Sequence, residues 1–552
     1  MSGPLHGREF SRKSFLKGGG ALIVGFGLAG VGAAGRASAA APGSRLPIPV
    51  DQLDSYFTVH PDNTITLYDS IMERGQGSRT ALLQIAAEEL DIGMDQISHA
   101  PLDTATAPYT GYTGGSQGTT IGGSYVRAAA ATAKQVLRSL ASVSLGVPVA
   151  SLSVEKGVVS GAGKSVTYGQ LVGGKLFNVT IPQTVQRNDT GVFQYLRRVG
   201  MEPGAPGAKP IDQYTLVTKP IPRVDVPGIV TATLAYSNDV RLPGMLHGRV
   251  VRPRGQSSLV DARTNLSSLF GVGVVGTNYT LELLAGGGQV PVAIDETSIK
   301  DIRGAEVVRV GNFVGVVAPT EWGAIQAAAE LKVTWEEPSS PLPGNGNLAG
   351  ALREPAPQAT PPLLITEMGN VDAGLAQAAK TVSATYRTSY LAHGPTGPHV
   401  AVADVTSTGA TIIHQSAGNY SIAGACVAQM LGLPATSVRE ISFQGSSIYG
   451  GISTDLDCAA AAALLSSHVG KPVRVQFMRW DEQGFDNYDA AEVIDVRAGI
   501  DAKGKIIVFD YVTNSPLGIA QPPAAWNTGG VYLIPNRSVV RNTGPQFLQT
   551  AP

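Results

Sequence analysis

The chain has 552 residues, of which 43% are hydrophobic and 15% are charged. This length is too great for a single hydrophobic core and predicts about three or four domains. With 41 basic and 42 acidic side chains, the formal net charge of -1 argues against nucleic-acid binding, because domains that bind phosphate backbones usually carry a basic excess.

Cysteine is scarce, since Cys426 and Cys458 are the only two in the sequence. Two thiols cannot hold an iron–sulfur cluster or a four-thiolate zinc site, so such a centre would have to belong to another chain. Both cysteines lie in alanine-rich stretches with helical character. This setting favours two buried free thiols over a disulfide between them.

The N-terminal residues have the pattern of an export signal. The basic stretch SRKSFLK, residues 11–17, precedes a glycine-rich apolar run and a small-residue stretch, ASAAAPG. This order predicts that residues 1–41 are a signal peptide. The stretch resembles the twin-arginine signal S-R-R-x-F-L-K, with Lys13 in place of the second arginine, and so predicts an exported protein of the periplasm or cell envelope. An uncleaved membrane anchor is the alternative, although the run is short for a span of about 20 residues.

Residues 42–205 begin as alternating strands and continue as two helices. Ser78 is placed to cap a helix with apolar positions between residues 82 and 90. A second amphipathic helix is predicted over residues 123–143, followed by short strands and turns. Glu73, just before the first helix, is expected at the surface or at a strand end.

Residues 212–337 alternate strand, turn, strand, helix and strand, which predicts an α+β module with its own core. Thr320 is placed to cap the helix, whose apolar positions include Ile325 and Leu331. The Pro/Gly-rich residues 338–364 have little apolar content and form the clearest linker in the chain.

Residues 365–552 alternate strands and helices around the stretch GSSIYGG, residues 445–451. This stretch separates a predicted strand from a helix expected from about Leu456, for which Asp455 is a natural N-cap. Its three glycines indicate either a tight turn or a place where bare backbone approaches a ligand. The stretch RWDEQGFD, residues 479–486, is expected to be a solvated charged turn.

Four stretches, in this order, carry a resemblance to a known family. They are ERGQGSRTALLQIAAEEL at 73–90, PYTGYTGGSQGTTIGGSYVRAAA at 108–130, the segment 222–253 that begins PRVDVPGIV, and the segment 445–482 that begins GSSIYGG. Together they resemble the large molybdopterin-binding subunits of the xanthine dehydrogenase/aldehyde oxidase family. The similarity is greatest to the isoquinoline 1-oxidoreductase beta-subunit-like branch, whose segment order is permuted.

The resemblance implies a multi-domain α+β fold with mixed sheets. Residues 42–205 would be the permuted molybdopterin-binding segment, and residues 212–337 an a/b hammerhead domain. After the linker, residues 365–552 would be a molybdopterin-binding domain that is incomplete at its C-terminus.

The resemblance also implies which residues bind the cofactor. Glycine-rich turns at helix starts can present backbone N–H groups to phosphates and ring acceptors. Gln76 would bond to the metal's ligands or to the pterin, and no side chain would bind the metal directly. The predicted cofactor-binding residues are Gly75, Gln76, Gly77, Thr113, Ser116, Gln117, Gln415, Ile448, Tyr449 and Gly450.

Two of the predicted positions have structural alternatives. His393 matches a family histidine and is a candidate for lining a substrate funnel, with Gly397 where many relatives have glutamate. The alternative is a purely structural histidine. Gln415 is equally well explained as a strand-end amide whose hydrogen bonds are satisfied within the protein.

The family's reaction implies a molybdopterin-dependent oxidoreductase that hydroxylates an aldehyde or an N-heteroaromatic carbon, with water as oxygen donor. The general base would be a glutamate in a Gly-Glu stretch. We expect it beyond Pro552, because no such stretch precedes that residue. The missing part would leave an apolar face exposed. The alternatives are an inactive or cofactor-free fragment that acts as a binding or scaffold protein, and a glycan- or peptide-binding protein unrelated to molybdenum.

The resemblance finally implies cofactors and partners. The cofactor would be molybdenum–molybdopterin in its cytosine dinucleotide form. Electrons would leave through a small subunit with [2Fe–2S] clusters and then a cytochrome c-type acceptor. The other partner would be a small-molecule substrate, and no nucleic acid is expected.

Overall fold

The structure is a computed structural model. It describes residues 48–114, 118–182, 186–187, 196–197, 200–253, 290–311, 313–336, 342–356, 363–415, 422–445, 449, 452–485, 488–516, 532–545 and 547–548. The predicted signal peptide lies outside these residues, as do the four predicted site residues Ser116, Gln117, Ile448 and Gly450. Within the described part, no helix has the length and apolarity that crossing a membrane requires.

The N-terminal layer packs two helices against a small sheet. Strands β1 (Phe57–Val59) and β2 (Ile65–Leu67) are antiparallel, and β3 (Ile97–His99) pairs with β2 in parallel. Helices α2 (Ser78–Leu90) and α3 (Gly123–Leu145) are the two predicted helices. The predicted cap was wrong, because Ser78 is the first residue of α2 and Gly77 is its N-cap. Both contribute to one apolar core with the sheet. The smaller elements of this layer are β5 (Ser153–Glu155), β6 (Val158–Gly161), β7 (Lys164–Thr167), α4 (Tyr168–Val172), β8 (Gln186–Arg187) and β9 (Leu196–Arg197).

An eight-stranded mixed sheet forms the centre of the molecule. Two of its neighbouring pairs, β10–β20 and β18–β19, are parallel and the others are antiparallel. All three predicted segments supply strands, so the sheet crosses the predicted boundaries. In spatial order the strands are β12 (Glu306–Val310), β13 (Phe313–Ala318), β10 (Leu246–Val250), β20 (Val473–Gln476), β17 (Val400–Thr406), β18 (Gly409–His414), β19 (Val438–Ser442) and β4 (Leu102–Asp103).

Two helices, α9 (Ile422–Leu431) and α10 (Ile452–Val469), cover this sheet. The alanines at 459–463 are completely buried, and their small side chains let α10 approach the strands closely. Cys426 and Cys458 are buried free thiols, which confirms the prediction. The helix begins at Ile452, so Asp455 lies inside it and is not its N-cap.

The predicted α+β module has a small core on the outer side of β13. Strands β11 (Pro291–Asp295) and β14 (Lys332–Trp335) pair antiparallel beside α6 (Glu321–Glu330). The Thr320 hydroxyl accepts a hydrogen bond of 3.0 Å from the Gly323 N–H, which confirms the predicted cap. Because β13 contacts this core on one face and the central core on the other, the module is attached firmly to the sheet.

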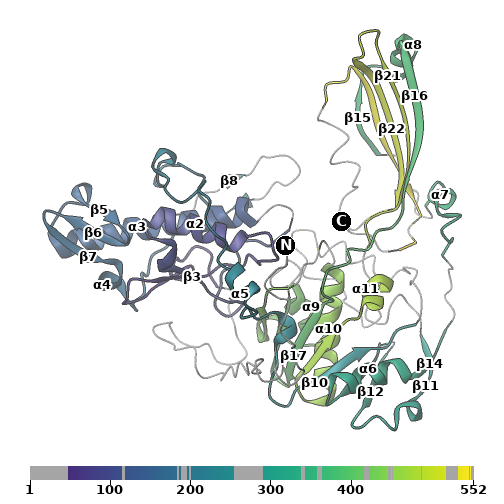
Figure 1. Ribbon diagram of the computed structural model, residues 1–552, viewed down its shortest axis with the longest axis horizontal. Coiled ribbons are helices and arrows are strands. Elements are labelled where there is room, and N and C mark those ends of the chain that lie inside the picture. Colours follow the sequence, from purple (N-terminus) through teal and green to yellow (C-terminus); the bar gives the residue numbers. More distant parts are fainter. Residues whose placement is uncertain are drawn as a thin grey trace, which may run out of the picture.

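A five-stranded sheet stands away from the other layers (Figure 1). Its spatial order is β15 (Leu363–Met368), β23 (Asn536–Gly544), β22 (Ile506–Pro516), β21 (Glu492–Ile500) and β16 (Lys380–Thr388). The edge strand β16 leaves Val382 and Tyr386 exposed. The remaining α-helices of the described part are short: α5 (Val226–Val230), α7 (Leu348–Ala351), α8 (Val371–Gln377) and α11 (Arg479–Phe485).

The stretch predicted as a solvated turn is helix α11 (Arg479–Phe485). Asp481 and Glu482 are 4% and 1% exposed, so the prediction was wrong. The Asp481 carboxylate accepts the Met478 N–H at 2.8 Å, and Glu482 accepts the N–H of His399 at 2.7 Å. These long-range and capping bonds offset the cost of burying both carboxylates.

Candidate functional site

Glu73 organises the turn that leads into α2. Its buried carboxylate accepts the N–H groups of Gly75 (2.8 Å), Gly77 (2.9 Å) and Arg79 (3.1 Å). Gly75 and Gly77 have φ of +102° and +84°, a conformation that glycine adopts without steric cost. The turn is thus an anion nest filled by the protein's own carboxylate. The expectation of a surface or strand-end Glu73 was wrong, because these N–H groups require a buried acceptor.

Gln76 and Thr113 close the same turn. The Gln76 amide donates to the Met72 carbonyl at 2.9 Å and to the Ser78 hydroxyl at 2.7 Å, and it accepts the Arg74 N–H at 2.7 Å. The Thr113 hydroxyl donates to the same Met72 carbonyl at 2.6 Å. The two predicted loops therefore meet, but these bonds of Gln76 go to its own turn and not outward. The predicted role of Gln76 toward a cofactor stays a prediction.

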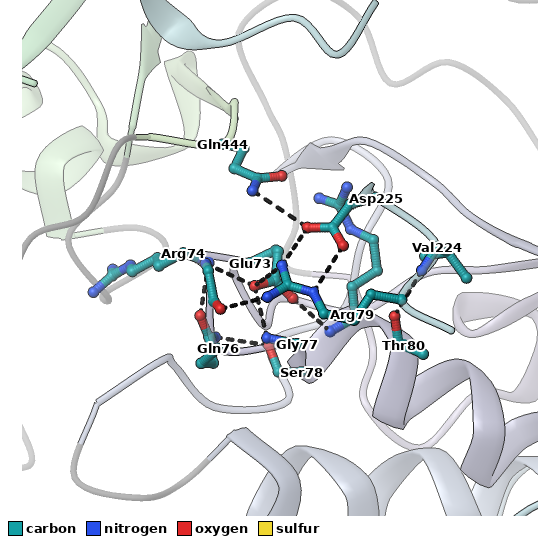
Figure 2. Close-up of polar contacts among 12 residues, drawn as sticks. Glu73, Arg74, Gln76, Gly77, Ser78, Arg79, Thr80, Val224, Asp225 and Gln444 are labelled. Carbon is teal, nitrogen blue, oxygen red and sulfur yellow. Dashed lines mark hydrogen bonds and ion pairs between the residues drawn. The ribbon is translucent and has the colours of Figure 1, made fainter. Parts of the chain in front are cut away.

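Residues 223–225 fasten this turn to the rest of the molecule. The Arg223 guanidinium donates to the Gly75 carbonyl at 2.6 Å and to the two carboxylate oxygens of Asp225 at 3.0 and 2.6 Å. On its other side, Asp225 accepts from Gln444 Nε2 at 3.4 Å. Figure 2 shows these contacts running from the Glu73 turn through Asp225 to Gln444.

Asp225 is held in its ionised form. Burial acts to raise the pKa of Asp225, but the hydrogen bonds and positive charge of Arg223 outweigh burial, so the pKa is lowered. The hydrogen bonds to Asp225 likewise raise the pKa of Arg223. An ionised carboxylate accepts hydrogen bonds and cannot donate them. Asp225 therefore fixes which end of a neighbouring amide faces it.

Gln415 and Gln444 follow the carboxyl ends of two neighbouring parallel strands, β18 and β19. Ligands of open α/β sheets bind at such strand ends. The two residues are 3% and 5% exposed, and within the described part Gln415 Nε2 and Gln444 Oε1 have no hydrogen-bond partner. Buried polar atoms are usually bonded. An unpaired donor and an unpaired acceptor that lie together at two strand ends could therefore bond to a ligand there.

Gly445 and Ser237 bring these two glutamines together. A Cβ on Gly445 would lie 2.6 Å from the Cβ of Gln415, so no larger residue fits. The Ser237 N–H donates to the Gln444 carbonyl at 3.4 Å, and its hydroxyl makes a long contact of 3.5 Å with Gln415 Oε1. The first glycine of GSSIYGG is therefore needed for a close approach of backbone to another part of the protein.

The structure brings most of the described candidates into two adjoining groups. Gly75, Gln76, Gly77 and Thr113 form one group, and Gln415 belongs to the other. Tyr449 is a non-glycine residue with φ of +51°, and it is 63% exposed. His393 is partly buried in the loop between β16 and β17, and its role stays a prediction. Within the residues described, no group of three or more His, Cys, Asp or Glu side chains could hold a metal ion.

Sequence reasoning missed Glu73, Arg223, Asp225 and Gln444 as site residues. Glu73 had a usable signal, because an acid two residues before Gly-x-Gly can receive the N–H groups of that turn. The others had none, since Arg223 is 148 residues from Gly75 and Asp225 is 219 residues from Gln444.

Comparison with known protein families gives two matches of the same kind. Residues 9–217 and residues 356–541 each match a model described as a molybdopterin cofactor-binding domain. The two matched segments together make up well over half of the chain, and they contain both groups of the candidate site.

Similar proteins include subunits of two bacterial oxidoreductases. A nicotinate dehydrogenase subunit of Pseudomonas putida is 33% identical over 88% of this chain and 37% of its own length. The beta subunit of isoquinoline 1-oxidoreductase from Brevundimonas diminuta is 32% identical over 35% of this chain and 27% of its own length. The chain thus spans little more than a third of the first relative.

Among solved structures, the aldehyde oxidoreductase of Desulfovibrio gigas aligns with 60% of this chain and 39% of its own chain. The TM-score is 0.43 and the sequence identity is 18%.

Proposed function

The chain belongs to the family of molybdopterin-binding oxidoreductase subunits, and on that premise we propose that it is the cofactor-binding part of a hydroxylase acting on an aldehyde or an N-heteroaromatic carbon. The substrate class follows the relatives, two of which are named for nicotinate and isoquinoline. The observation that carries the proposal is the pair of buried amide atoms on Gln415 and Gln444 that have no hydrogen-bond partner among the described residues.

The residues present fit such a cofactor. A pterin offers ring N–H donors and a carbonyl acceptor, which complement an unpaired acceptor on Gln444 and an unpaired donor on Gln415. When bound, the molybdenum centre supplies oxidation of an activated carbon with water as oxygen donor. This chain's share is to orient the cofactor: Gly445 allows the close packing of the two glutamines, and the Glu73 turn supports Arg223 from the other side.

The partners and the location belong to the same proposal. Electrons would pass to a small [2Fe–2S] subunit and a cytochrome c-type acceptor, and the pterin would carry a cytosine nucleotide. The N-terminal basic and apolar pattern supports export to the periplasm or cell envelope.

The rival function, a cofactor-free binding protein, is favoured by one observation. The N–H groups of Gly75 and Gly77, which the sequence pattern assigns to an anionic cofactor, donate to Glu73. A turn whose N–H groups already donate to a carboxylate of the protein does not need a ligand to accept those hydrogen bonds.

Direct analysis separates the two functions. The full chain would be purified from a bacterial host that makes molybdopterin dinucleotides, and its molybdenum and its nucleotide, released by acid, would be measured. We expect about one molybdenum and one cytosine nucleotide per chain. A chain that is folded by circular dichroism but holds neither would overturn the proposal and favour the rival.

A further inference from the structure

Gln444 stands out because its two amide ends have opposite surroundings. Nε2 faces the Asp225 carboxylate at 3.4 Å, whereas Oε1 is buried and has no hydrogen-bond partner in the described part of the chain. The whole residue is 5% exposed. An unmade hydrogen bond at a buried acceptor costs free energy, so a ligand that donates to this oxygen would recover that cost.

Asp225 fixes the orientation of this amide. A flipped amide would place Oε1 against the carboxylate, and two acceptors would then repel each other. Arg223 holds the carboxylate through two hydrogen bonds, and it is anchored in turn on the Gly75 carbonyl. Arg223 therefore fixes the Asp225 carboxylate, and the carboxylate in turn keeps Gln444 Oε1 pointing away from it.

Gln415 lacks this constraint. Its Oε1 faces the Ser237 hydroxyl at 3.5 Å, and a hydroxyl can either donate or accept. The Gln415 amide can therefore turn to suit a ligand, whereas that of Gln444 cannot. Gln415 would therefore make an adaptable contact with a ligand, and Gln444 a fixed one.

From this geometry we propose that Gln444 is a cofactor-positioning residue, whose Oε1 accepts an N–H of the bound pterin, and that Arg223 and Asp225 set its orientation. The inference rests on the proposed function. It places the fixed hydrogen-bond acceptor on a residue outside the glycine-rich turns. It also explains why residues 223–225, which are more than a hundred residues away in the sequence from both Gly75 and Gln444, lie between these two residues in the fold. The ligand chemistry it predicts is a ring N–H next to a carbonyl, as in a lactam edge.

The first test is Gln444→Met, which keeps the length of the side chain and removes both polar ends. The full chain would be purified from the same molybdopterin-producing host, and molybdenum and nucleotide per chain would be measured after dialysis. We expect cofactor retention to weaken about tenfold, the size expected for one buried hydrogen bond. The matched control is Gln96→Met, because the Gln96 amide donates to the backbone carbonyls of Asn63 and Lys156, outside the site.

A stability measurement distinguishes positioning from a merely structural role. Without cofactor, Gln444→Met removes a buried acceptor with no partner in the described part of the chain, and it also removes the long 3.4 Å hydrogen bond to Asp225. These two effects oppose each other, so its unfolding temperature should stay close to that of the wild-type chain. A structural residue would show the opposite, with lower stability and with cofactor lost only in proportion to unfolded protein. Asp225→Asn, which frees the amide to flip, should also weaken retention.

These experiments distinguish a failure of this inference from a failure of the proposed function. A wild-type chain that holds no cofactor would contradict both proposals. A loaded wild-type chain with an equally loaded, folded Gln444→Met variant overturns this inference alone.

Discussion

The two halves of the candidate site differ in how completely they satisfy their polar groups. In the turn around Glu73, the carboxylate, the Gln76 amide and the Thr113 hydroxyl all bond within the turn or to its edge. At the ends of β18 and β19, two buried glutamines each keep one amide atom unpaired within the described part of the chain. The comparison teaches that the N–H groups of a glycine-rich turn can be satisfied within the protein, while the unpaired buried atoms of the site lie on glutamines that follow two strand ends.

The largest expected effect is that of Glu73→Gln. The neutral side chain has a single acceptor oxygen for three N–H donors, and hydrogen bonds to charged groups are the stronger ones, so we expect the free energy of unfolding to fall by about 3 kcal/mol. Denaturant unfolding followed by circular dichroism measures this. Glu155→Gln, at an exposed strand position, is the control. Equal midpoints for the wild-type chain and Glu73→Gln would show that the turn is not held by this carboxylate.

A smaller loss is expected for Gly445→Ala on the other side of the comparison. The new methyl group would lie 2.6 Å from Gln415 Cβ and 2.8 Å from its Oε1, and overpacking of this kind costs about 2 kcal/mol. Retention of molybdenum should fall together with stability, because Gln415 must move. Gly346→Ala is the control, since a Cβ there meets nothing within 4 Å. An unchanged unfolding midpoint for Gly445→Ala would contradict the close approach.

The smallest expected effect is the pH dependence of the stability that the Arg223–Asp225 ion pair contributes between the two halves of the site. The pKa of Asp225 is lowered in the folded chain, so its stabilisation is present above the unfolded pKa of about 3.9 and is lost as the pH falls through the lower folded pKa. The Arg223 side chain is 33% exposed, so we expect less than about 1 kcal/mol.

The difference in stability between the wild-type chain and Asp225→Asn should be constant from pH 7 to about pH 5 and should shrink below about pH 4. Asp301→Asn, at an exposed position, should show no such trend. A difference that grows on acidification would have the wrong sign for this ion pair.

The sequence by itself determined the local features. Apolar periodicity predicted α2 and α3, and a threonine at the right offset predicted the cap of α6, because helix starts and amphipathic faces depend on residues a few positions apart. The ordered series of glycine-rich stretches also led to the molybdopterin-binding family, which two family matches support.

Only the tertiary structure decided which polar groups are buried and what they bond. Glu73 and Glu482 appear as ordinary surface acids in the sequence, yet each accepts hydrogen bonds inside the protein. Arg223, Asp225 and Gln444 meet only because the central sheet and α2 bring distant segments together. The reason is that burial and pairing depend on long-range packing, which no local pattern of residues records.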